Sequence, residues 1–326
     1  MGEGRNFGSI LITPGCSNNC VFCKIKAYPD KKDLTKEDEK QLLIDSMFFI
    51  KKGYKTIDIS GSEPLRYSKI IPYFKWITQF FKEVNLLDPC NRLVDEEFCK
   101  EVLSCGISRI LLPIYGSKPE IHNACVGNPE AFDNITKALS NIKKYNKNVK
   151  IEITTMILKQ NYFDIAELAR FIDKAGFHLD KITIPHCHAD NKAINYDEFV
   201  ADFDKVRNAL LSVDKELSNI FLDHIPACIL KPEEIQNMQY SFFNEYYLYK
   251  LSEKNKETPK VEEIVKDYRG QHQTKYCKEC YLFKEGICGG IYKGHYERNL
   301  NYHFHPFTKE GYLKNKEKIV FLKVNK

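Results

Sequence analysis

The chain has 326 residues, 43% of them hydrophobic, which is long for one ordinary domain and enough to bury a sizeable core. The net charge of +5 is a small excess of basic residues on a mixed surface, so the composition does not indicate a nucleic-acid partner. No segment approaches the roughly 18 consecutive apolar residues of a membrane span, and no signal peptide is recognisable, so we expect a cytoplasmic protein without a membrane partner. In that reducing compartment the twelve cysteines would be ligands or free thiols rather than disulfides.

Residues 8–188 alternate short apolar strands with amphipathic helices, a pattern typical of a parallel β/α barrel. The expected strands are Ser9–Thr13, Thr56–Ser60, Glu83–Leu87, Arg109–Ile114, Lys150–Ile157 and Lys181–Pro185. The expected helices are Lys36–Lys52, Ile70–Phe81, Asp95–Cys105, Phe132–Tyr145 and Tyr162–Ala175. Six units rather than eight predict an α/β fold with a partial (β/α)6 barrel of the TIM type over residues 1–190.

The remaining residues predict a bridge and a small appended domain. Residues 191–225 are expected to bridge, with a helix over Tyr196–Leu217 and a short strand at Ile220–Ile225. Residues 226–326 are expected to form a small C-terminal domain, because their last fifty residues are dense in Cys, Gly, His and aromatic residues. Within it, Lys250–Tyr268 is polar and rich in lysine, which indicates a surface helix or a mobile segment.

Three cysteines, Cys16, Cys20 and Cys23, follow the first expected strand with the spacing Cys-x3-Cys-x2-Cys. Thiolates so close together can converge on one soft metal centre. They are one fewer than the four ligands of a closed zinc or iron–sulfur site, so one metal position would stay open for chemistry. A thioredoxin-type Cys-x-x-Cys explains the block less well, because it leaves Cys16 without a role.

This block, with Phe22 before its last cysteine, resembles the signature of the radical S-adenosylmethionine (radical SAM) enzymes. The turn Gly61-Ser62-Glu63-Pro64 after the second strand is similar to the Gly-Gly-Glu-Pro turn with which that family binds the amino group of SAM, although Ser62 stands in place of one glycine. A turn at the carboxyl end of a barrel strand points its polar groups at the mouth of the barrel, where a carboxylate can pair with an ammonium group. The resemblance therefore implies that Gly61, Ser62, Glu63 and Pro64 contact SAM.

Further matches extend this resemblance across the first 190 residues, at Tyr115-Gly116, His122, Gly127–Phe132 and Asn161. Family members carry a small hydroxyl residue on strand four that contacts the SAM ribose, but here that position is Pro113. Thr154 and Thr155 on strand five are candidate substitutes, of which only one can face the interior. Ordinary β-propensity explains both threonines equally well.

The tail carries a second cysteine group, Cys277, Cys280 and Cys288, with the spacing Cys-x2-Cys-x7-Cys of a metal knuckle. Cys228, at the end of the short strand, is a plausible fourth ligand. The tail resembles the auxiliary-cluster domains of SPASM or twitch type that follow many radical SAM barrels, which implies a second [4Fe–4S] cluster. A structural zinc knuckle completed by Cys228 or His295 is the alternative.

Two other cysteines lie close to expected strand ends. Cys187, within His186-Cys187-His188, follows strand six, and Cys90 follows strand three. Either thiol could donate a hydrogen atom to a substrate radical, since strand ends face the substrate in such barrels. The ordinary role of a lone cysteine is that of a small buried hydrophobic residue.

The resemblance implies an enzyme in which Cys16, Cys20 and Cys23 hold a [4Fe–4S] cluster that binds SAM. With an electron from a flavodoxin or ferredoxin type reductant, SAM is cleaved to a 5′-deoxyadenosyl radical that abstracts a substrate hydrogen. The barrel with a single auxiliary-cluster tail favours crosslinking or epimerisation of a ribosomally synthesised precursor peptide. The alternatives are a radical SAM enzyme acting on a small molecule or an RNA nucleoside, and a non-enzymatic protein that binds metal at both motifs.

Overall fold

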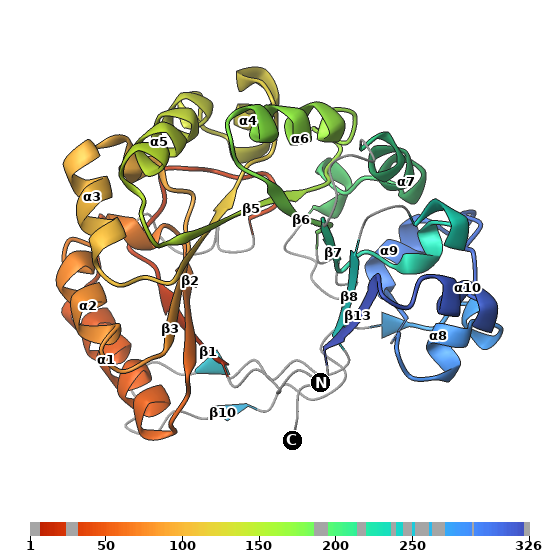
Figure 1. Ribbon diagram of the computed structural model, residues 1–326, viewed down its shortest axis with the longest axis horizontal. Helices are drawn as coiled ribbons and strands as arrows, with labels where there is room; N and C mark the ends of the chain where they lie inside the picture. The colour runs from red at the N-terminus through yellow and green to blue at the C-terminus, as the bar shows by residue number, and fades with distance from the viewer. Residues whose placement is uncertain are drawn as a thin grey trace.

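Parallel strands form one continuous sheet whose outer face is covered by helices (Figure 1). The computed structural model describes residues 7–23, 32–185, 195–213, 220–235, 239–243, 250–251, 261–262, 271–288 and 290–322. Within these ranges the sheet consists of β1 (Phe7–Ile12), β2 (Thr56–Gly61), β3 (Glu83–Leu87), β4 (Arg109–Pro113), β5 (Lys150–Met156), β6 (Leu179–Thr183), β7 (Phe221–Asp223), β8 (Gln239–Phe243) and β13 (Ile319–Leu322).

Ten α-helices occur in the described ranges, and none is long and apolar enough to cross a membrane. They are α1 (Lys36–Lys51), α2 (Ile70–Ile77), α3 (Glu96–Ser104), α4 (Pro119–Val126), α5 (Ala131–Tyr145), α6 (Ile165–Lys174), α7 (Phe203–Ser212), α8 (Tyr281–Lys284), α9 (Lys293–Arg298) and α10 (Lys309–Lys314). The first helix begins where the sequence supplies a capping box. Thr35 Oγ1 accepts from the Asp38 N–H at 3.2 Å, and the Asp38 carboxylate accepts from the Thr35 N–H at 3.1 Å.

The order of strands in the sheet follows the chain from β1 to β8, and β13 returns from the C-terminal region to pair with β8. All neighbouring strands are parallel. In Figure 1 the strands follow an open ring with α1 to α7 on the outside. The predicted α/β fold with a partial barrel is confirmed. The six expected strands all form, and β7, β8 and β13 continue the same sheet.

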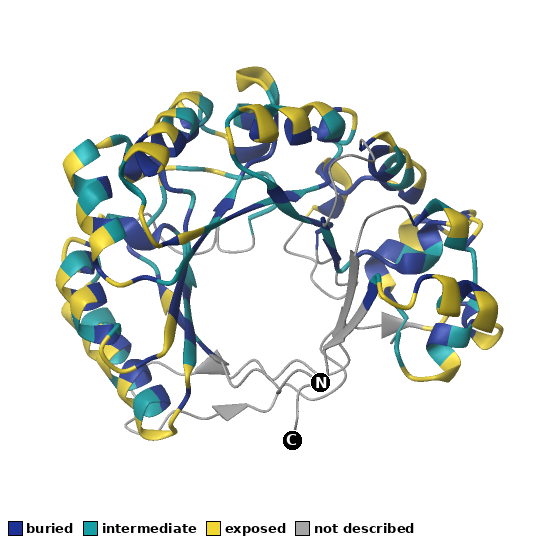
Figure 2. Ribbon diagram, in the orientation of Figure 1, coloured by how far each residue is buried: buried dark blue, intermediate teal, exposed yellow. Residues whose placement is uncertain are grey.

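The two faces of the sheet differ in polarity because side chains alternate along each strand. The outward face is apolar and buried beneath the helices; its fully buried members include Ile57, Ile59, Ile110, Leu112 and Ile153. Figure 2 shows the buried sides of the helices turned toward the sheet and their exposed sides turned to solvent. This outward face therefore carries the main hydrophobic core.

The inward face carries polar and charged side chains. Asn85 donates to Asp58 at 2.7 Å, and the Arg109 guanidinium pairs with Glu152 at 2.8 Å. Lys181 lies 3.9 Å from Glu152. A closed eight-stranded barrel fills its interior with branched apolar side chains. A polar inner wall is instead suited to an open barrel that leaves room for a polar ligand.

The predicted continuous helix over Tyr196–Leu217 is wrong. In the described part of that range a short 3₁₀ turn, η3 (Tyr196–Glu198), is separated from α7 by a non-helical stretch. Tyr196 and Phe199 belong to a small apolar cluster beside α4, whereas Phe203 belongs to the main core. The chain therefore turns between two separate apolar surfaces, which a single straight helix cannot reach.

The C-terminal region contributes to the sheet as well as to the small helices α8, α9 and α10. Both β8 and β13 come from residues 226–326. Two short antiparallel pairs complete the described strands there, β9 (Lys250–Leu251) with β10 (Val261–Glu262), and β11 (Gln271–His272) with β12 (Ile291–Tyr292). Most of the lysine-rich stretch 250–268 lies outside the described residues.

Candidate functional site

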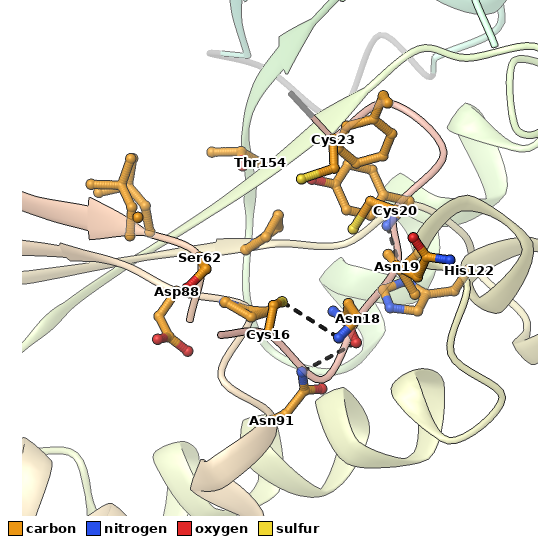
Figure 3. A pocket seen from close by; sticks show the side chains of 18 of the residues that line it. Cys16, Asn18, Asn19, Cys20, Cys23, Ser62, Asp88, Asn91, His122 and Thr154 are labelled. Carbon is orange, nitrogen blue, oxygen red and sulfur yellow. Dashed lines mark hydrogen bonds between the residues drawn. The ribbon is translucent and has the colours of Figure 1, made fainter. Parts of the chain in front are cut away.

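A cavity of about 750 Å³ lies at the carboxyl ends of β1 to β5 (Figure 3). Its wall includes the three cysteines after β1, two residues of the turn after β2, and residues at or just beyond the ends of β3, β4 and β5. These are Cys16, Cys20, Cys23, Gly61, Ser62, Leu87, Asp88, Pro113 and Thr154. The sequence placed most of these positions at strand ends, and parallel strands bring such ends to one edge of the sheet.

Cys16, Cys20 and Cys23 line this cavity and are each partly exposed. Burial raises the pKa of Cys16 to about 11, and burial together with the charges of the other two thiols raises the pKa of Cys20 to about 12. Three soft thiol donors on one wall suit an iron–sulfur cluster, whose positive irons hold cysteines as thiolates. Among the described residues, no three His, Cys, Asp or Glu side chains come within reach of one single metal ion. A four-iron cluster spreads its thiolates farther apart than one ion does, so the donor set fits a cluster.

The cysteine loop is held against the end of α4. The Asn19 N–H donates to the Val126 carbonyl at 2.8 Å, and the Val21 N–H donates to the Cys125 carbonyl at 3.0 Å. Gly127 ends α4 with a φ of +61°, and a Cβ on it would lie 2.4 Å from the Asn19 carbonyl oxygen. Only glycine allows this close approach of the helix end to the loop.

The turn after β2 passes very close to β1. Gly61 has a φ of +143°, and a Cβ there would lie 2.0 Å from the Ile12 carbonyl oxygen. Ser62, which replaces the glycine of the family pattern, donates to the Gly15 carbonyl at 2.6 Å and so ties this turn to the chain just before Cys16. Gly61 and Ser62 line the cavity, whereas Pro64 is buried and does not line it.

Glu63 is completely buried behind this wall. Its Oε2 accepts from the Ser17 N–H at 2.8 Å and from the Ser17 hydroxyl at 2.6 Å, so the carboxylate supports the cysteine loop. Its Oε1 is buried without a hydrogen-bond partner in the structure as described. A buried carboxylate oxygen of this kind is costly until it receives a donor, and an ammonium group would satisfy it.

The two threonines of β5 lie on opposite faces. Thr154 lines the cavity beside its register partner Pro113. Thr155 is only 1% exposed on the outer face, and its hydroxyl has no hydrogen-bond partner in the described structure. Of this predicted pair, only Thr154 can meet a ligand in the cavity.

Asp88 and Asn91, just after β3, line the cavity and were not predicted from the sequence. The Asp88 carboxylate accepts from the Leu65 N–H at 2.9 Å and from the Cys90 N–H at 2.6 Å. Burial, and next the charge of Glu63, raise the pKa of Asp88 to about 8. The sequence signal that could have identified Asp88 is a polar residue directly after a buried strand, which is also the signal at the turn after β2.

Three further positions that match the family pattern have structural contacts here. The Phe22 and Tyr115 rings lie 4.9 Å apart between centroids at the cavity wall. His122 accepts from the Tyr115 N–H at 3.1 Å, and burial lowers the pKa of His122 to about 4, so its ring is neutral. Asn161 is fully buried and donates to the Tyr115 carbonyl at 2.8 Å, which joins the segments after β4 and β5.

Cys90, a predicted hydrogen donor, is not among the residues that line the cavity. It has a left-handed φ of +62°, is fully buried in the core, and its thiol donates to the Asp88 carbonyl at 3.3 Å. Its side chain lies in the main hydrophobic core rather than in the cavity at the barrel mouth. The other predicted donor, Cys187, lies outside the described residues, as do His186 and His188.

The structure brings the four cysteines of the second predicted group together. Cys228, Cys277, Cys280 and Cys288 line one small cavity of about 20 Å³ in the C-terminal region. Burial raises the pKa of Cys228, and the nearby charges of the other three thiols raise it further. His295, the alternative fourth ligand, is not among the residues that line this cavity and instead has its Nε2 2.7 Å from the Pro185 carbonyl oxygen.

The structure is an open parallel barrel with three thiols at its mouth, and this arrangement is typical of proteins that bind a metal cluster at the ends of barrel strands. The sequence profile of the Radical SAM superfamily matches residues 10–172, half of the chain, and the protein belongs to this superfamily. Membership implies a [4Fe–4S] cluster and SAM, which the three thiols and the adjoining turn at Gly61 and Ser62 in the cavity wall fit.

Two curated relatives each match about half of the chain. A probable GTP 3′,8-cyclase of Thermococcus kodakarensis is 23% identical over 177 residues, which cover 54% of this chain and 55% of that protein. The AdoMet-dependent heme synthase of Oleidesulfovibrio alaskensis is 24% identical over 173 residues, covering 52% of this chain and 43% of that protein. The chain thus spans about half the length of these relatives.

Among solved structures, Streptococcus suis SuiB matches with a TM-score of 0.51 and 16% identity, covering 78% of this chain and 54% of that chain. SuiB bound to the precursor peptide SuiA matches with a TM-score of 0.50 and 15% identity, covering 64% and 45%. At this identity the likeness concerns the fold.

Proposed function

We propose that this protein is a radical SAM enzyme that modifies a ribosomally synthesised peptide by crosslinking or epimerisation. The observation that carries the proposal is the gathering of Cys228, Cys277, Cys280 and Cys288 around one cavity outside the barrel mouth. Four thiols there suit a second [4Fe–4S] cluster of the SPASM or twitch type. The fold is also similar to that of SuiB, which has been solved bound to a precursor peptide.

At the barrel mouth, Cys16, Cys20 and Cys23 would hold the SAM-binding cluster. Gly61 and Ser62, which line the cavity, would contact the SAM ammonium, and the Thr154 hydroxyl would face the ribose, while Glu63 supports the cysteine loop from behind the wall. When bound, the cluster and SAM would supply one-electron reductive cleavage of SAM, with a flavodoxin or ferredoxin type protein as electron donor, and so the radical chemistry that removes one substrate hydrogen. The chain's own residues position the groups and exclude water from them.

The two modifications differ in what happens to the substrate radical. A crosslink forms one new bond and releases one further electron and one proton, so it needs an electron acceptor, which the four-cysteine site would provide. An epimerisation returns one hydrogen atom to the substrate, so it needs a donor thiol, for which Cys187 remains the candidate. Of the two, the four-cysteine cavity favours crosslinking.

The second candidate function is modification of a small molecule. Its support is that the curated relatives with significant similarity include GTP 3′,8-cyclases and a heme synthase. An RNA nucleoside substrate and a non-enzymatic metal-binding role have less support from the site.

The test uses the full chain, reconstituted with iron and sulfide without oxygen and given SAM and a one-electron reductant. We expect 5′-deoxyadenosine to form, and a Cys20→Ala variant to form none. If the reduced, iron-loaded wild type forms none, the enzyme proposal is wrong.

The same assay separates the substrates. A short peptide encoded beside the gene should raise 5′-deoxyadenosine formation and lose two hydrogens in mass on crosslinking, whereas GTP should do neither. Turnover of GTP with no change in the peptide would support the small-molecule function instead.

A further inference from the structure

The loop between Cys16 and Cys20 is held by side chains from separate parts of the chain. The Asn18 Oδ1 accepts from the Asn91 side-chain amide at 3.3 Å and from the Asn128 side-chain amide at 2.9 Å. Asn91 follows β3, and Asn128 lies between α4 and α5. Two amides from different elements therefore fix one side chain inside the cysteine motif, and Figure 3 shows the contact between Asn91 and Asn18.

Each of these two asparagines is itself anchored. The Asn91 amide also donates to the Ser17 hydroxyl at 3.0 Å, and Asn91 is only 8% exposed. The Asn128 Oδ1 accepts from the Glu130 N–H at 3.0 Å, which holds Asn128 in the turn before α5. The two amides thus act on Asn18 from fixed positions rather than from flexible ends.

The consequence of this arrangement lies at Cys16. The Asn18 backbone N–H donates to the Cys16 sulfur at 3.4 Å (Figure 3). A hydrogen bond to a sulfur ligand stabilises negative charge on that sulfur. Reduction of an iron–sulfur cluster adds one electron, part of whose charge falls on the thiolates, so such a hydrogen bond favours the reduced state.

We propose that Asn91 and Asn128 are positioning residues that aim the Asn18 N–H at the Cys16 sulfur and thereby raise the reduction potential of the cluster held by Cys16, Cys20 and Cys23. The inference rests on the proposed function at these cysteines. Both asparagines are neutral donors. A carboxylate at either position could not donate to the Asn18 oxygen, and it would bring negative charge near the cluster. The pair therefore eases electron uptake without adding charge to the cavity.

The test compares Asn91→Ala, Asn128→Ala and the double variant with wild type, all reconstituted as the full chain. The matched control is Asn146→Ala, directly after α5, whose side chain donates to the Val149 carbonyl at 2.7 Å and accepts from the Val149 N–H at 2.9 Å. The midpoint potential is measured by redox titration followed by electron paramagnetic resonance. We expect the double variant to lower the equilibrium constant for one-electron reduction about tenfold, which is ~59 mV to more negative potential. Asn146→Ala should match wild type.

A second readout follows the hydrogen bond itself. In the reduced wild type, an exchangeable proton coupled to the cluster should be visible by pulsed resonance and should weaken in the double variant. A double variant that keeps its full iron, its potential and this coupling would overturn the proposal. If the double variant loses iron, the two single variants take its place, because each keeps one amide on Asn18. An unchanged potential and an unchanged proton coupling in both single variants would then overturn the proposal.

These measurements do not depend on turnover, so the two proposals fail in different ways. A cluster that shows the expected shifts but cleaves no SAM contradicts the proposed function alone. A cluster that cleaves SAM with the same potential and coupling in all variants contradicts only the role of Asn91 and Asn128.

Discussion

At the scale of single residues, the face of the sheet on which a side chain lies decides whether its polar group can contact a ligand in the cavity. Thr154 and Thr155 are neighbours with the same chemistry, yet one lines the cavity and the other is buried beneath the helices. The Thr155 hydroxyl has no partner in the described structure, so it costs the fold free energy instead of supporting a ligand.

This contrast gives a matched pair of variants. Thr154→Val should weaken SAM binding about 2- to 10-fold, because it removes one hydrogen bond worth about 0.5–1.5 kcal/mol. Thr155→Val should leave binding unchanged and raise the free energy of unfolding by about 1 kcal/mol, because it removes an unsatisfied buried hydroxyl. Calorimetric titration with SAM and thermal unfolding measure the two effects. Equal binding by both variants would exclude a contact from Thr154.

At the scale of elements, the end of α4 shapes the cysteine loop. Gly127 has a left-handed conformation and also meets the Asn19 carbonyl, so two separate constraints act at one residue. Gly53, after α1, has a φ of +74° but nothing within 4 Å of its would-be Cβ. The two glycines therefore separate backbone strain from a steric clash.

Gly127→Ala should displace the cysteine loop, while Gly53→Ala should only add strain. Both should lose about 1 kcal/mol of stability from the left-handed backbone. Gly127→Ala should also lose further stability and retain less iron after reconstitution, because its Cβ would push against the loop at 2.4 Å. Iron analysis and thermal unfolding check this. Equal iron retention in the two variants would show that the loop tolerates the contact.

Helix α1 carries a buried acid that makes stability depend on pH. Asp45 is 9% exposed and accepts from the Gln41 amide at 2.7 Å, and burial raises its pKa from 3.8 to about 6. Because the folded-state pKa is the higher one, the folded protein binds more protons than the unfolded chain between about pH 4 and pH 6. Stability therefore falls as the pH rises through this window.

Asp45→Asn removes the charge and keeps the acceptor for Gln41. At about pH 8 the variant should be more stable than wild type by up to about 3 kcal/mol, and the difference should vanish below about pH 3, where Asp45 is neutral in both the folded and the unfolded chain. Urea unfolding across this range measures it, with the exposed Glu101→Gln on α3 as control. A gain that persists undiminished below about pH 3 would exclude the charge as its cause.

At the scale of the whole molecule, the chain offers two separate thiol sites joined by one sheet. The barrel mouth carries three cysteines, and the second cavity carries four. The β7–β8 segment and β13 connect the second region to the barrel, since all belong to the same sheet. With a cluster at each site, the shared sheet would hold the two clusters in one folded unit, between which electrons could pass.

Cys228→Ala should lose about half of the bound iron, because it opens only the second of two clusters. SAM binding at the barrel mouth should be unaffected. Cys105→Ala, at the end of α3 and away from both cavities, should keep all the iron. Unchanged iron in Cys228→Ala would remove Cys228 from the ligand set, and zinc in place of iron would indicate a structural knuckle.

The sequence alone determined the alternation of strands and helices, the partial barrel and the cysteines of the mouth, because these depend on short-range periodicity and spacing. It also grouped Cys277, Cys280 and Cys288 for the same reason. Only the tertiary structure decided that Thr154 faces inward, that Cys90 is buried in the core, and that β13 returns to the sheet. The hydrogen bonds from Asn91 and Asn128 to Asn18 could not be predicted from the sequence either. Asn91 is 73 positions from Asn18 and Asn128 is 110 positions from it, and contacts over such separations depend on strand register and sheet curvature, which local patterns do not encode.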